Sequence, residues 1–392
     1  MSNANNNSGI LNKAYLACYA LTLFAVFISK GGIIRILGYV NVLFLIYFFS
    51  IGGQKLRGWF SLPKLLFLPL AFIMIDVVAT HRLSFDNEYR EIILVTFFGL
   101  TTYFIAKNKL SNFRQALDCS MLLLVIFVIF QLVSIWVLKK PYGTTKNPHY
   151  LALYSAYGVV FSVFYYNCTS SIKRYLAIPV LIFLVAIVLM TSSRPTWISL
   201  FLAAIISLLF FNKKMIAAGF LFLLGITTFL FEFNVGRFGS RMSDLILNIT
   251  TEERVTIWRD AWTMQKSSTI YEWLFGHGLN VFEENFKKFS SYHLEGIDFT
   301  MPHNIFLELL YSSGMIGLGL MCFIYVYIFR LLIKFVIPNE HNKKLGLALL
   351  SVLIINLVMG FLTVRWFTHF NSYVIAFELG IIYFIKNKSV NN

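Results

Sequence analysis

The sequence predicts an all-α, polytopic membrane protein, and its composition and its apolar runs are the observations that predict it. Of 392 residues, 58% are hydrophobic and only 13% are charged, and the mean hydropathy is +0.72. A soluble core of this length could not bury so much apolar surface. We count twelve apolar stretches, each close to the roughly 20 residues that a helical span needs. This composition excludes a soluble enzyme, a DNA-binding domain and a secreted disulfide scaffold.

The predicted spans follow one another along the chain, with breaks at charged residues, glycine or proline. They are expected near residues 14–29, 33–51, 63–79, 91–106, 119–138, 148–166, 174–192, 195–211, 214–231, 304–335, 345–363 and 369–386. The first stretch has no clear cleavage site, so we expect a retained span. The seventh and eighth are joined by a tight turn at Ser193-Arg194-Pro195, because proline suits the first turn of a helix.

Three segments follow from this pattern. They are residues 1–231 with spans one to nine, residues 232–302 as one large outer loop, and residues 303–392 with spans ten to twelve. In the loop, Thr250 and Glu253 have the spacing of a capping box, which predicts an amphipathic helix over about 251–266.

Basic residues set the predicted orientation. With the N-terminus inside, cytoplasmic loops hold 17 of the 33 basic residues, short outer loops hold 9, and the long loop holds 7. The positive-inside rule therefore places both termini in the cytoplasm. The inner side has 13 Lys and 4 Arg, whereas the outer side has 7 Lys and 9 Arg. Arginine clamps phosphate bidentately, so the outer face suits an anion, with chance in small counts as the alternative.

Several kinds of site are not indicated. The long loop has ten acidic and seven basic residues, so no nucleic-acid partner is expected. The four cysteines stand alone, and His277 and His293 lack metal-ligand spacing. There is no nucleotide-binding glycine motif, and no Ser-His-Asp set is apparent. We therefore expect no cofactor.

The predicted loop helix carries two arginines of interest. On a helical wheel its apolar arc consists of Val255, Ile257, Trp258, Ala261 and Trp262. Arg254 falls near the middle of this arc, and Arg259 lies at its edge. An arginine on an apolar stripe needs a counter-charge, and a phosphate can supply it. The alternative is that Arg254 pairs with a nearby glutamate or reaches the membrane interface.

Two further residues are candidates on the outer face. Arg194 stands at the end of two apolar spans with no acidic residue within thirty positions, which favours a functional site over an arginine that binds lipid headgroups. His303 precedes a helix start, where the helix dipole favours the neutral, basic ring; a simple cap or polar anchor is the alternative. Glu308 could orient His303 or partner an arginine. Lys146, Asn147 and Arg365 could line an anion entrance or act as interfacial anchors.

Four short motifs, in order, carry a resemblance to a known family. They are Gly143-Thr144-x-x-Asn147-Pro148, Thr191-Ser192-Ser193-Arg194, Arg254-x-x-x-Trp258 with Leu274-Phe275-Gly276-His277-Gly278, and His303-Asn304-x-x-Leu307 with Ser313-Gly314-Met315-Ile316-Gly317-Leu318. Together they resemble the O-antigen ligase and polysaccharide polymerase superfamily. One departure is His149, where asparagine is expected.

The resemblance implies a GT-C-like membrane glycosyltransferase that needs neither metal nor nucleotide. Such enzymes transfer a glycan from an undecaprenyl diphosphate carrier to an acceptor hydroxyl at the periplasmic face of the bacterial inner membrane. The resemblance implies that the large outer loop, residues 232–302, is periplasmic. Arg194 and Arg254 would then bind the diphosphate, and His303 would orient or deprotonate the acceptor. The expected substrate-binding residues are Arg259, Lys146, Asn147, Trp258, Asn304, Glu308 and Arg365.

The single large loop favours an O-antigen ligase, whose acceptor is a lipid A–core sugar. The alternative is an O-antigen or capsular polysaccharide polymerase, whose acceptor is a second carrier-linked repeat unit. A transporter of the same lipid-linked glycan is a third reading. Transporters usually have polar residues at mid-span and repeat symmetry, whereas here Asp76 and Glu378 are the few acidic residues near spans, no repeat is visible, and the basic groups gather on one side. The expected partners are the carrier-linked glycan, the lipid A–core acceptor and membrane lipid. The residues leave open whether a chain-length regulator also binds.

Overall fold

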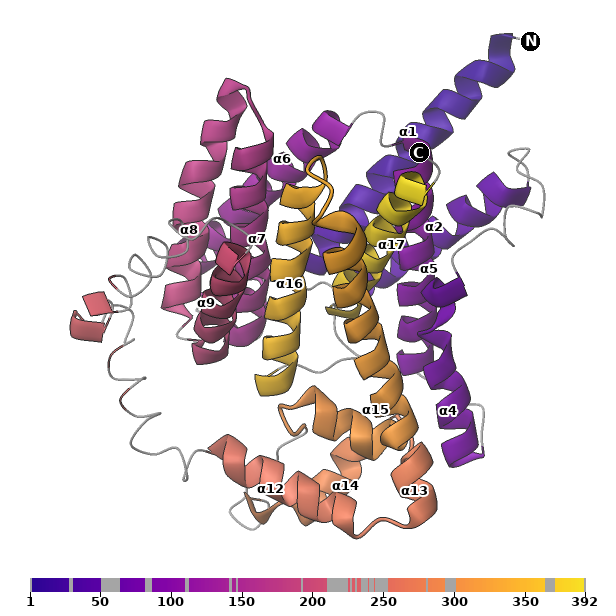
Figure 1. The fold of residues 1–392 in the computed structure, drawn as a ribbon, viewed down its shortest axis with the longest axis vertical. Helices are drawn as coiled ribbons and strands as arrows, with labels where there is room; N and C mark the ends of the chain where they lie inside the picture. Colours follow the sequence, from indigo (N-terminus) through magenta and orange to yellow (C-terminus); the bar gives the residue numbers. More distant parts are fainter. Residues whose placement is uncertain are drawn as a thin grey trace. The chain divides into compact units, whose positions relative to one another are not determined.

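The structure is a computed structural model, and Figure 1 shows its ribbon. It describes residues 2–27, 31–50, 64–81, 87–109, 113–140, 143–145, 147–191, 193–209, 253–279, 281–292, 301–363 and 371–390, with a few single positions between 225 and 243. Every regular element in these ranges is a helix, as the composition predicts.

Apolar helices identify the chain as a membrane protein. Among the described residues, five helical segments are long and apolar enough to cross a membrane. They are Glu88–Lys107, Leu117–Val137, Ile172–Met190, Ile305–Val336 and Lys343–Leu362. Shorter apolar helices cover Ala14–Val26, Gly32–Tyr47, Leu70–Thr80 and Arg194–Ile206. The predicted span 214–231 lies largely outside the described residues, so the count of twelve spans stays a prediction.

The chain divides into two compact units. The first consists of Met1–Ile73, Ser84–Ile129 and Phe370–Asn392, and the second of Met74–Leu83 and Phe130–His369. The helices of the first unit are α1 (Ser2–Phe27), α2 (Gly31–Ser50), α5 (Asn87–Lys109), most of α6 (Phe113–Leu132) and α17 (Asn371–Val390). Within it, α5 and α17 pack closely where Gly99 faces the backbone of Ala376. The buried Glu91 carboxylate pairs with Arg35 at 2.6 Å and accepts a hydrogen bond from the Tyr373 hydroxyl.

In the second unit, α16 (Lys343–Leu362) packs against α7 (Pro148–Cys168), α9 (Arg194–Leu209) and α15 (Ile305–Leu331). Helix α8 (Ala177–Met190) packs against α7. The α16 side chain of Asn356 donates to the Tyr157 hydroxyl on α7 at 3.0 Å and accepts from the Tyr325 hydroxyl on α15 at 2.7 Å. Buried polar groups need such partners, so this triplet fixes α16 between its neighbours.

The long loop holds more structure than the single helix that the sequence predicts. Beside α12 (Glu253–Lys266) there are two further short helices, α13 (Ile270–Phe275) and α14 (Phe282–Phe289), and all three gather at one end of α15 (Figure 1). Helix α12 covers most of the range 251–266 that the sequence predicts for an amphipathic helix, and Thr250 of the expected capping box lies outside the described residues. A capping box does form at α13, between Thr269 and Glu272.

A bend in α15 joins these helices to the apolar part of the unit. Gly314 has φ +63° inside α15, so the predicted run 304–335 is not one continuous helix. In an unbroken helix the carbonyls of Tyr311 and Ser312 would accept from N–H groups four residues later. Here they accept from the backbone N–H groups of His277 and Gly278, each at 2.9 Å. The loop after α13 is therefore docked by its backbone onto the bend.

Two glycines make this contact close. Gly314 has its α-carbon against the backbone of Leu274, and Gly276, with φ +82°, has its α-carbon against the backbone of Ser312. A side chain at either position would overlap a backbone carbonyl and would also require a left-handed conformation that other residues adopt at a cost.

We therefore predict that Gly314→Ala destabilises the protein by about 2 kcal/mol or more, through both strain and overlap. The matched control is Gly319→Ala, because a methyl group at Gly319 of the same helix would meet no atom within 4 Å. Thermal unfolding of purified protein in detergent checks this. Equal melting temperatures for the two variants would contradict the role of the bend.

Candidate active site

The loop before α7 ends in residues that are typical of a helix N-terminus. Asn147 is the N-cap of α7, and its side-chain oxygen accepts from the His149 backbone N–H at 2.8 Å. Pro148 occupies the first turn, where a missing N–H costs nothing. The Asn147 side chain therefore has a structural role in addition to the predicted substrate contact, and the predicted Lys146 lies outside the described residues.

This loop contacts the turn that carries Arg194. The His149 imidazole Nδ1 lies 2.9 Å from the fully buried Ser193 Oγ, which in turn lies 2.9 Å from Thr196 Oγ1. Arg194 follows at the first position of α9 and is partly buried. His149, the position that departs from the expected motif, thus links two of the motifs.

On α12, the centre of the predicted apolar arc is buried, whereas two residues at the edges of the arc are exposed. Ile257, Ala261 and Met264 are buried and pack against α14 and Tyr311. Val255 and Trp262, which the wheel placed on the apolar arc, are each 40% exposed, because the neighbouring helices cover only the centre of the arc. Arg254, which the wheel placed near the middle of the arc, is partly buried, whereas Arg259 is exposed.

His303 lies where the sequence places it, directly before a helix. Asn304 is the N-cap of α15 and accepts from the backbone N–H groups of Phe306 and Leu307. His303 itself has φ +51°, and its Nδ1 lies 3.4 Å from the Thr363 carbonyl oxygen at the end of α16. A carbonyl only accepts, so Nδ1 carries the proton in this contact, and Nε2 is then the basic nitrogen of the neutral ring.

The last turn of α16 contacts three of the predicted motifs, and the sequence reasoning missed it. Met359 Sδ accepts from Thr196 Oγ1 at 3.3 Å, next to the Arg194 turn. The Phe361 ring contacts Trp258 of α12 with centroids 5.5 Å apart, and Thr363 contacts His303. The only sequence signal nearby was Arg365, two residues further on, which lies outside the described residues. Thr196 lies two positions after Arg194, and Trp258 lies one helical turn after Arg254. The segments that carry Arg194 and Arg254, and His303 itself, therefore contact the same helix end.

Unsatisfied polar atoms lie at this helix end. The Trp258 Nε1 and the Thr363 Oγ1 are both buried and have no hydrogen-bond partner among the described residues. Buried polar atoms of this kind are rare in folded proteins and need an explanation. A sugar hydroxyl can accept from an indole N–H and either donate to or accept from a threonine hydroxyl.

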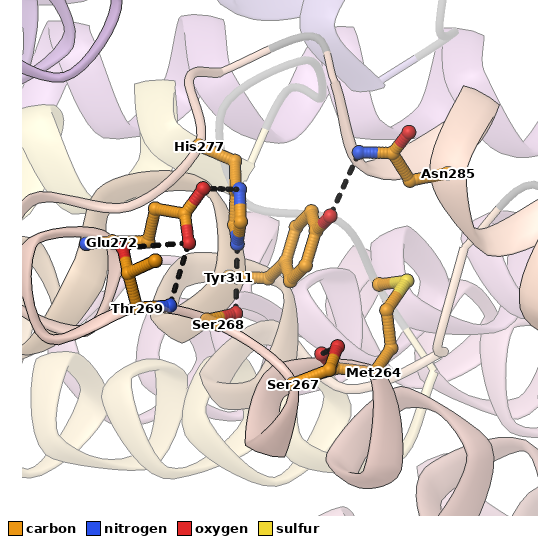
Figure 2. A network of polar contacts seen from close by, with 8 residues as sticks. All are labelled: Met264, Ser267, Ser268, Thr269, Glu272, His277, Asn285 and Tyr311. Atoms are coloured by element: carbon orange, nitrogen blue, oxygen red, sulfur yellow. Dashed lines mark hydrogen bonds and ion pairs between the residues drawn. The ribbon is translucent and has the colours of Figure 1, made fainter.

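A second polar cluster lies between α12, α13 and α15 (Figure 2). The His277 ring is stacked on the Tyr311 ring, with the ring centroids 4.1 Å apart. Its Nδ1 contacts Glu272 and its Nε2 contacts Ser268. Tyr311 accepts from Asn285 Nδ2 at 2.7 Å. Burial lowers the pKa of His277, and the Glu272 carboxylate partly opposes this. The hydrogen bond from the Thr269 backbone lowers the pKa of Glu272. In the sequence, His277 belongs to the Leu274–Gly278 motif and lacks metal-ligand spacing, and nothing there predicts its contacts with Glu272 and Ser268.

Comparison with known proteins identifies a family domain. Residues 179–324 match the model of the O-antigen ligase family. The matched range runs from α8 into α15 and contains Arg194, Arg254 and His303. This match supports the O-antigen ligase superfamily that the four motifs resemble. A comparison with curated protein sequences finds no match.

The lowered pKa of His277 predicts a pH-dependent stability. The folded state favours the neutral ring of His277. The contribution of this ring to folding stability is therefore complete above the pKa of about 6.5 that histidine has in the unfolded chain, and it declines as the pH falls below that value. Between about pH 7.5 and about pH 5.5, the melting temperature should fall less in His277→Gln than in the wild type. His341→Gln, at an exposed histidine, is the control and should match the wild type. An equal fall in melting temperature for His277→Gln and the wild type would contradict a lowered pKa of His277 in the folded state.

Proposed function

Because residues 179–324 match the O-antigen ligase family, we propose that this protein is an O-antigen ligase. It transfers a polysaccharide from undecaprenyl diphosphate to a sugar hydroxyl of lipid A–core at the periplasmic face of the inner membrane. The observation that carries the proposal is the meeting of three motifs at the last turn of α16, beside the buried Trp258 Nε1 and Thr363 Oγ1.

The donor diphosphate is bound by Arg194 and Arg254 in this proposal. Both are partly buried, which strengthens their attraction for phosphate relative to exposed arginines. Their guanidinium groups match the geometry of phosphate oxygens and stabilise the negative charge that develops as the diphosphate leaves. Arg259, Lys146, Glu308 and Arg365 remain proposed contacts around the donor, and Trp258, Asn147 and Asn304 line the same region.

The acceptor hydroxyl is deprotonated by His303. Its Nδ1 donates to the Thr363 carbonyl, so Nε2 is the atom that takes the proton. The hydroxyl oxygen then attacks the anomeric carbon, the bond from that carbon to the diphosphate oxygen breaks, and the diphosphate leaves with the bonding electrons. A single displacement of this kind inverts the anomeric centre. No step requires a metal ion.

A polymerase would use the same arginines and histidine with another acceptor. Purified protein is therefore given the carrier-linked glycan with lipid A–core, and in a separate reaction the glycan alone, both with EDTA. We expect product on lipid A–core in the first reaction. A ladder of longer carrier-linked chains in the second would make the protein a polymerase, and movement of carrier lipid across liposomes without transfer would make it a transporter.

We predict that Arg254→Lys lowers transfer at least about tenfold, because a point cation lacks the bidentate fork of arginine. The rate of transfer by purified variants measures this. Arg330→Lys, an exposed change at the far end of α15, is the control and should keep the wild-type rate. Near wild-type transfer by Arg254→Lys would count against diphosphate binding at this residue.

We also predict that His303→Ala lowers transfer by about a hundredfold or more while the donor still binds, because only proton removal is lost. Donor affinity is measured by thermal shift or by binding of radiolabelled carrier lipid. A loss of binding as large as the loss of transfer would remove His303 from the role of base.

A further inference from the structure

Ser268, His277 and Glu272 form a continuous line of contacts in the long loop (Figure 2). Ser268 Oγ lies 2.8 Å from His277 Nε2, and His277 Nδ1 lies 3.3 Å from Glu272 Oε1. The serine follows α12, the glutamate lies on α13, and the histidine follows α13. This set is not recognisable in the sequence, because the spacing of Ser268, Glu272 and His277 matches no familiar hydrolase motif.

The direction of the hydrogen bonds follows from chemistry. The Glu272 carboxylate is ionised at neutral pH and can only accept, so His277 Nδ1 carries the proton that points at it. In the neutral ring Nε2 then has a lone pair and accepts. The Ser268 hydroxyl therefore donates its proton to His277 Nε2. This is the polarity in which a histidine can activate a serine.

The surrounding residues hold this arrangement in place. The other carboxylate oxygen of Glu272 accepts from the Thr269 backbone N–H at 2.6 Å. The imidazole is stacked on Tyr311, and the His277 backbone is bonded to the bend of α15. Burial favours the neutral ring, which is the form that accepts a proton. The three groups are thus oriented before any substrate binds.

The serine is also accessible. Ser268 is partly exposed, and the Glu272 and His277 side chains are 34% and 16% exposed. Beside the serine, α13 presents apolar side chains to the outside, with Ile270 82% exposed and Leu274 44% exposed. An apolar group next to the nucleophile suits an acyl chain better than a sugar.

We propose that Ser268 is an activated nucleophile, with His277 as its general base and Glu272 as the orienting carboxylate, at a site that cleaves carboxylic esters of apolar acyl chains. The serine oxygen attacks the ester carbonyl carbon while its proton passes to His277 Nε2. The bond from that carbon to the alkoxy oxygen breaks, and the alcohol leaves with the proton. Water, deprotonated by His277, then releases the carboxylic acid and restores the serine. The proposal does not depend on glycan transfer.

The test uses a fluorophosphonate probe, which phosphonylates activated serines with loss of fluoride, on the full chain in detergent. We expect the probe on Ser268 of the wild type, located by mass spectrometry of the labelled peptide, and no labelling of Ser268→Ala. Ser267→Ala is the matched control: this neighbouring hydroxyl donates to the Met264 carbonyl instead of the histidine, and the variant should label like the wild type.

Glu272→Gln separates catalysis from folding, because glutamine keeps the capping box of α13 but removes the charge. Its labelling, and its hydrolysis of p-nitrophenyl butyrate, should be at least about tenfold slower than in the wild type. His303→Ala should label normally, which separates this site from glycan transfer. An unlabelled wild type, or equal labelling of Ser268→Ala, would overturn the proposal, and equal labelling of Glu272→Gln would remove the glutamate from it.

Discussion

The bend of α15 at Gly314 is the constraint on which the positions of α12, α13 and α14 in the second unit depend. It exposes the carbonyls of Tyr311 and Ser312 to the loop after α13, and it lets two backbone segments meet where a side chain would collide. Through this contact, His277 is placed on the Tyr311 ring and the loop helices gather at one end of α15. The bend also leaves residues 315–336 as a run of about the length that crosses a bilayer.

The end of α16 is a second place where several segments of the second unit meet. The Asn356 triplet holds this helix between α7 and α15, and its last turn then meets the Arg194 turn, the Trp258 face of α12 and His303. The Arg194 turn, Trp258 and His303 are far apart in the sequence, yet all three segments pack against the end of α16. Electrostatic stabilisation of a leaving diphosphate needs such preorganisation, because arginines that reoriented during the reaction would lose part of their effect.

Much of the fold could be predicted from the sequence, because a bilayer requires long apolar helices and these leave a clear pattern. The helix over 251–266 and the helix start after His303 were predicted as well, from periodicity and capping residues. The bend at Gly314 could not be, because an apolar run looks the same whether it is straight or kinked. The contacts at Met359 and Thr363, and the line from Ser268 to Glu272, depend on tertiary packing that no local pattern encodes.

The central claim is that the motifs around the end of α16 form one binding site for a lipid-linked diphosphate glycan. The most direct test is an electron cryomicroscopy structure of the protein in lipid nanodiscs with a phosphonate analogue of the undecaprenyl diphosphate donor. The claim predicts density for the two phosphorus groups against Arg194 and Arg254, with the first sugar beside Trp258 and Thr363. Ordered analogue elsewhere on the protein, with these side chains unoccupied, would contradict it.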